Sequence, residues 1–100
     1  MDSSDEFLAE VNSMIQLREK KNHDYGDGFI ESYNKYGKQA LFFDLLRKWT
    51  RIEKILLKDN ELKVADETVE DTLMDLAAMS LNGIVWLKRS KKCQKHLKKE

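Results

Sequence analysis

Carboxylates spaced one helical turn apart are the residues of this chain whose types and spacing could do chemistry. Asp71 and Asp75 are four residues apart, and Glu67 precedes Asp71 by four more. On a helix these three side chains share one side. Because oxygen-ligated Mg²⁺ needs grouped carboxylates, the spacing predicts that Glu67, Asp71 and Asp75 hold this metal. Asp71 and Asp75 are then also the expected catalytic residues.

Two cations on another expected helix could complement these carboxylates. Lys48 and Arg51 are three residues apart, which places them on one side of the helix, where they could contact phosphate oxygens. Chemistry on a triphosphate would then be attack by a metal-activated water. Two structural alternatives remain: an ordinary surface ion pair between Asp44 and Lys48, or a buried network in which the acidic residues pair with Lys48 and Arg51.

A polar segment, KKNHDYGDGF at residues 20–29, interrupts the helical pattern. Two glycines among Asn, His and Asp are typical of a turn. A turn between helices brings polar side chains to one point, so Lys21, Asp24 and Tyr25 are expected to contact a ligand. The alternative is a plain connector in which Asp24 or Asn22 caps the next element.

Helices must position all these residues, because the composition favours an all-α protein. The chain has 100 residues and no Pro, and it is rich in helix formers. We expect one domain, residues 1–100, built as a small bundle of three main helices and a short one. The expected parts are a first helix at 1–21, a polar turn and short helix at 22–37, a third helix at 38–57, a central helix at 64–90 and a basic tail at 91–100. Gly37 should end the short helix in a left-handed conformation.

The central helix, opened by Asp66 as N-cap, is apolar on nearly every side. One stripe, expected to face a partner helix, contains Val69, Leu73, Leu76, Ser80, Gly83 and Leu87. The other side carries Met74, Ala78, Leu81 and Val85. A helix of this kind lies at the centre of a bundle or in an oligomer interface. Since a short chain buries a modest core, we expect a homodimer or a higher homo-oligomer.

Charge and hydropathy exclude several classes of protein. The net charge is zero, so the chain is no nucleic-acid clamp, although its basic tail could attract nucleic acid weakly. The single Cys93 cannot form an internal disulfide. No apolar run approaches the length of a membrane span. The expectation is a soluble, cytoplasmic protein without a membrane partner.

Several motifs also resemble a known family. These are Lys21-x-x-Asp24-Tyr25-Gly26, Lys48-x-x-Arg51, Asp66-Glu67-Thr68 and Asp71-Thr72-Leu73-Met74-Asp75-Leu76-Ala77. Together they resemble the first family of nucleotide-modification-associated domains, small helical proteins of phages and prophages, over about residues 21–87. That family is similar in arrangement to MazG-like all-α nucleoside triphosphate pyrophosphatases, whose helices supply Mg²⁺-binding carboxylates. The resemblance implies a nucleotide ligand, the cytoplasm of a bacterial host, and site residues Lys21, Asp24, Tyr25, Lys48, Arg51, Asp66, Glu67, Asp71 and Asp75.

Two functions are therefore expected. The first is nucleotide binding, with Mg²⁺-dependent pyrophosphohydrolase activity as its catalytic form. The second is a non-catalytic interaction protein that sequesters a nucleotide signal or inhibits a host or phage enzyme. Ala78 and Met79 favour the second function, because an Asn and a Tyr commonly follow the D-L-A segment in the family that the chain resembles.

Overall fold

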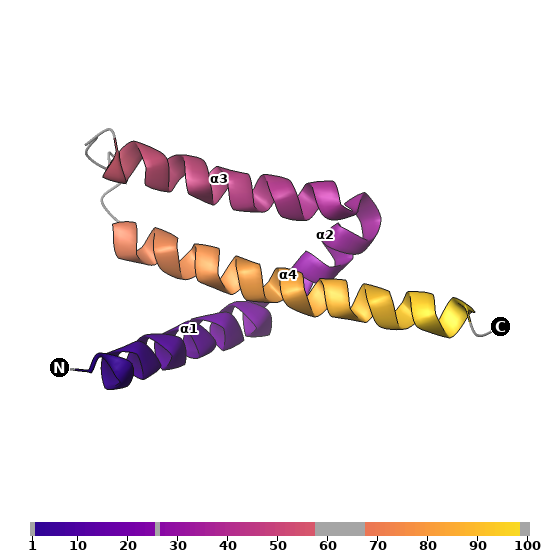
Figure 1. Cartoon of the computed structure of the whole chain (residues 1–100), viewed down its shortest axis with the longest axis horizontal. Coiled ribbons are helices and arrows are strands. Elements are labelled where there is room, and N and C mark those ends of the chain that lie inside the picture. The colour runs from indigo at the N-terminus through magenta and orange to yellow at the C-terminus, as the bar shows by residue number, and fades with distance from the viewer. Residues whose placement is uncertain (1, 26, 58–67, 99–100) are drawn as a thin grey trace.

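The computed structural model describes residues 2–25, 27–57 and 68–98, and the side chains of 2–21, 27–57 and 68–92. The all-α prediction is confirmed: within these ranges every regular element is a helix. There are four, α1 Ser4–Tyr25, α2 Gly28–Tyr36, α3 Lys38–Leu56 and α4 Val69–Lys98. Figure 1 shows α3 and α4 lying side by side in opposite directions, with α1 on the other side of α4. The central place expected for the last helix is confirmed, since α4 contacts each of the other three helices.

The first helix is longer than the sequence predicts. It begins at Ser4. The Asp2 carboxylate accepts hydrogen bonds from the backbone N–H and the hydroxyl of Ser4, at 3.0 and 2.7 Å. The helix continues through Tyr25 and so takes in part of the expected polar turn. The backbone of Asp24 and Tyr25 is therefore helical, and their side chains lie outside the described part of the structure.

Gly37 joins α2 directly to α3. Its N–H donates to the carbonyl oxygen of Tyr33 at 2.8 Å, which closes α2 as predicted. Its φ of 75° is positive, as expected, but its ψ of −160° lies outside the left-handed helical region. Glycine adopts this combination readily because it has no Cβ. The junction thus needs glycine, and α3 begins at the next residue.

The start of α4 is fixed by a reciprocal capping box. The N–H of Asp71 donates to the Thr68 hydroxyl oxygen at 3.1 Å, and the N–H of Thr68 donates to the Asp71 carboxylate at 3.2 Å. The helix begins at Val69, later than the sequence predicts, and extends to Lys98 through most of the expected tail. Asp66, the expected N-cap, lies outside the described residues.

The face of α4 that packs on α3 is rotated from the predicted stripe. The buried positions of α4 in its described part are Thr72, Gly83 and Trp86. Gly83 belongs to the predicted stripe and is buried as expected, whereas Leu73 and Ser80 of that stripe are exposed. Thr72 can be buried because its hydroxyl donates to the carbonyl of Thr68. Gly83 permits close approach, since a Cβ there would lie 2.9 Å from a terminal methyl of Leu41.

The core of the described chain is small. Its buried large apolar side chains are Tyr33, Ile52 and Trp86. The Tyr33 and Trp86 rings meet edge to face with centroids 5.7 Å apart, and the Trp86 indole N–H donates to Asn34 at 2.9 Å. These contacts hold α2 against α4. The molecule measures 54 × 31 × 29 Å, and none of its described helices is long and apolar enough to cross a membrane.

Candidate functional site

A pocket of about 220 Å³ lies where the four helices meet. Its charged lining residues are Arg18, Lys21, Asp44, Lys48 and Asp75. Its other lining residues are Met14, Leu17, Phe29, Tyr33, Ala78, Met79 and Asn82. The pocket therefore combines charged groups with an apolar wall, as small-molecule sites commonly do.

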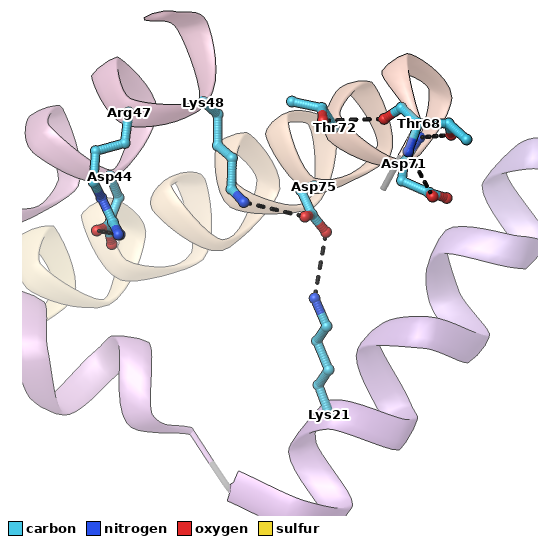
Figure 2. A network of polar contacts seen from close by, with 8 residues as sticks. All are labelled: Lys21, Asp44, Arg47, Lys48, Thr68, Asp71, Thr72 and Asp75. Atoms are coloured by element: carbon cyan, nitrogen blue, oxygen red, sulfur yellow. Dashed lines mark hydrogen bonds and ion pairs between the residues drawn. The ribbon is translucent and has the colours of Figure 1, made fainter. Parts of the chain in front are cut away.

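Asp75 of α4 is the meeting point of two lysines from different helices. Its Oδ1 lies 3.3 Å from Lys21 Nζ of α1, and its Oδ2 lies 3.3 Å from Lys48 Nζ of α3. Figure 2 shows both ammonium groups directed at the one carboxylate. The Lys48 and Asp75 side chains are 24% and 21% exposed, whereas Lys21 is 57% exposed. Of the residues expected at the site, the structure thus brings Lys21, Lys48 and Asp75 together.

Asp44 makes contacts different from the expected ones. The Tyr33 hydroxyl donates to its Oδ2 at 2.9 Å, and Arg47 lies 2.7 Å from its Oδ1. The alternative of a surface ion pair between Asp44 and Lys48 is therefore wrong, because the Lys48 ammonium group contacts Asp75 instead. Burial raises the pKa of Tyr33 to about 12, together with the hydrogen bond to Asp44 and the charge of that carboxylate.

The sequence interpretation missed Arg18, Tyr33 and Asn82. The Arg18 Nε donates to the Asn82 side-chain oxygen at 2.8 Å, and its guanidinium lies 5.7 Å from the centre of the Phe29 ring. On the sequence Arg18 is an ordinary charge of an amphipathic helix. Asn82 did carry a signal, because it is a lone amide within the apolar run MSLNGIVWL.

The remaining expected site residues are placed apart from the pocket or lie outside the described residues. Asp71 is exposed, and its carboxylate completes the capping box of α4. Arg51 is half-buried on α3 and is not among the residues that line the pocket. Glu67, and the side chains of Asp24 and Tyr25, lie outside the described residues.

The described donors do not fit the predicted Mg²⁺ site. No group of three or more His, Cys, Asp or Glu side chains gathers within the described part of the chain. Both oxygens of Asp75 face ammonium groups, and one oxygen of Asp71 accepts a backbone N–H. Glu67, the remaining expected ligand, is not described, so we derive no chemical step through a metal.

No protein-family model, no curated protein and no solved structure matches this chain. The family resemblance over residues 21–87 therefore remains a prediction. The structure establishes an all-α architecture, with four helices in the described part of the chain. Any functional conclusion must then come from the chemistry of the pocket.

Proposed function

We propose that the pocket binds the phosphate group of a small molecule, and that this molecule is a nucleotide. The observation that carries the proposal is the convergence of Lys21 and Lys48, from α1 and α3, on the one carboxylate of Asp75. With Arg18, the lining residues include three cations and two carboxylates. The pocket therefore has an excess of positive charge, which favours an anion.

The lysines retain bonding capacity for such an anion. Each ammonium group has three N–H donors, and the two distances of 3.3 Å to Asp75 are longer than the roughly 2.7–2.9 Å of a strong charge-assisted hydrogen bond. A phosphate oxygen can therefore bind Lys21 and Lys48 without breaking an optimal pair. The exposed side of Lys21 gives access from solvent.

The rest of the pocket suits the sugar or base of a nucleotide. Phe29 and Met79 supply an aromatic and a polarisable apolar surface, and Asn82 supplies an amide. The volume of about 220 Å³ is below the roughly 300–1,000 Å³ of typical ligand sites. A nucleotide would thus place its phosphate end among the lysines and only part of its remainder within the pocket.

Binding without turnover is the form of this function that the contacts favour. Asp75, expected to be catalytic, is neutralised by two lysines, and Asp71, expected beside it, caps a helix. This supports the non-catalytic alternative, a phage or prophage protein that sequesters a nucleotide. Mg²⁺-dependent hydrolysis stays a prediction that depends on Glu67, Asp71 and Asp75.

Isothermal titration with ATP and with inorganic triphosphate, each with and without Mg²⁺, tests the proposal. We expect Lys48→Ala to weaken binding about tenfold or more, because a hydrogen bond to a charged group contributes roughly 1.5–3 kcal/mol. Lys54→Ala is the matched control, since it removes the same charge from an exposed position of α3 outside the pocket. Equal affinities of the two variants would overturn the proposal, and phosphate release in the same samples would show turnover.

A further inference from the structure

An apolar surface lies on the side of the α3–α4 pair away from the pocket. We call it the open face; it comprises Phe42, Leu46 and Trp49 of α3 and Leu73 and Ile84 of α4, all exposed. On each helix these residues lie about 60–140° round from the positions that face the other helix, Leu41 and Ile52 on α3 and Thr72 and Gly83 on α4. Because the helices are antiparallel, such positions fall on the same side of the pair (Figure 1). Both helices thus present exposed apolar residues on this side, and between Leu73 and Ile84 the open face borders the apolar pocket that Ala77 lines with Phe7 and Val11 of α1.

The exposed area is too large for a compact monomer. The chain exposes 8516 Å², whereas a folded monomer of 11.8 kDa exposes about 5,900 Å². The surplus of roughly 2,600 Å² exceeds the roughly 800 Å² that each partner buries in a standard interface. The radius of gyration of 16.4 Å likewise exceeds the roughly 13 Å of a compact domain of this length. The chain therefore exposes enough surface to form an interface of standard size with a partner.

We propose that a second copy of this chain covers the open face, so that two α3–α4 pairs form a four-helix bundle. Because the core of one copy is small, burying the open face against a partner would stabilise the fold. A second copy of the chain can supply two more helices of the same kind for such a bundle. A two-fold axis brings the same surface of both copies together, which is the common arrangement of homodimers.

Charge along the open face supports this partner. Exposed acidic residues, Glu53 and Glu70, flank one end of the face, and exposed basic residues, Lys88 and Lys91, flank the other. A two-fold axis across the helices reverses one copy, so that the acidic end of each copy meets the basic end of the other. The face is thus complementary to itself, and the net charge of zero adds no repulsion between the copies.

Sedimentation equilibrium of the full chain at micromolar concentration tests this inference. The wild type should have twice the mass of 11.8 kDa. Ile84→Glu should weaken association about 100-fold, because it places an unpaired charge in the interface. Val85→Glu is the matched control: it changes the next residue, which is 37% exposed and lies about 100° round the helix from Ile84. A monomeric wild type, or equal losses in both variants, would overturn the proposal.

Fluorescence gives a second measurement that needs no charged substitution. The chain has two Trp, and in one copy Trp86 is 7% and Trp49 is 55% exposed. In a Trp86→Phe variant the emission of Trp49 should shift to shorter wavelength and resist quenching as protein concentration rises. A folded variant whose Trp49 stays accessible to the quencher at all concentrations would refute the inference. The pocket is on the other side of the pair, so either outcome leaves the nucleotide test intact.

Discussion

Replacing Asp75 by Asn separates a pocket that binds phosphate from one that uses this carboxylate for metal or catalysis. In the structure Asp75 neutralises Lys21 and Lys48, and it is the lining carboxylate nearest to both ammonium groups in Figure 2. Asn keeps the size of the side chain and removes its charge. If the lysines hold phosphate, Asp75→Asn should therefore strengthen binding, whereas a metal-holding or catalytic carboxylate would give the opposite result.

The size of this effect follows from the charge that is removed. A phosphate held by the two lysines would lie about 5 Å from the Asp75 carboxylate, where one pair of unit charges repels by about 0.8 kcal/mol in bulk water and about 3 kcal/mol at an effective dielectric constant of 20. Because Lys21 is exposed, the effective dielectric constant at the site should lie between these two values. We therefore expect a gain of about 1–2 kcal/mol, which is about 5- to 30-fold in affinity.

Titration calorimetry with inorganic triphosphate measures this gain, first at low salt and then at 1 M salt. The gain should shrink at high salt, because the screening length falls to about 3 Å. Glu19→Gln is the control, since it removes a carboxylate from an exposed position of α1 outside the pocket. Weaker binding by Asp75→Asn, or loss of a Mg²⁺-dependent part of the affinity, would refute the reasoning and restore Asp75 as a metal ligand.

Two further predictions concern stability. Thr68→Ala should lower the free energy of unfolding by about 1 kcal/mol, and the Tm by about 4–8 °C, because it removes the acceptor for the Asp71 N–H; differential scanning calorimetry checks this. Asp71→Asn should cause a similar loss, and an unchanged Tm with a lost response to Mg²⁺ would contradict the capping role. The raised pKa of Tyr33, about 12 against an ordinary 10.0, contributes stability that is fully present below pH 10 and lost as pH rises to about 12. Tyr33→Phe should remove a phenol that titrates at about pH 12 from an ultraviolet titration, and an unaltered curve at that pH would contradict the assignment.

Apolar periodicity predicted the long helices α3 and α4 well, because each carries apolar residues at helical spacing over many residues. The ends were less certain, since they depend on local polar contacts. Thr68 and Asp71 form a reciprocal pair at the start of α4, and the spacing that made Asp71 a metal candidate is also the spacing of a capping box. Sequence spacing alone cannot distinguish the two, because both place a carboxylate one turn into a helix.

The pocket could be predicted only in part, because it depends on how the helices rotate against one another. Lys21, Lys48 and Asp75 were expected at one site, and they do meet. Gly83, which belongs to the predicted stripe, does face Leu41 of α3, but Thr72, whose hydroxyl donates to the Thr68 carbonyl, is buried although a stripe of apolar residues does not include it. This rotation places Asn82 in the pocket and leaves Leu73 exposed.

The same rotation connects the two proposals. Turning Thr72 and Gly83 toward α3 directs Asp75 and Asn82 to one side of the α3–α4 pair and Leu73 and Ile84 to the other. The polar side then receives α1 and α2, which close the pocket, whereas Leu73 and Ile84 stay exposed on the other side. A dimer formed through the open face would stabilise α3 and α4, the helices that carry Lys48 and Asp75. Association is therefore expected to tighten the pocket without contributing a residue to it.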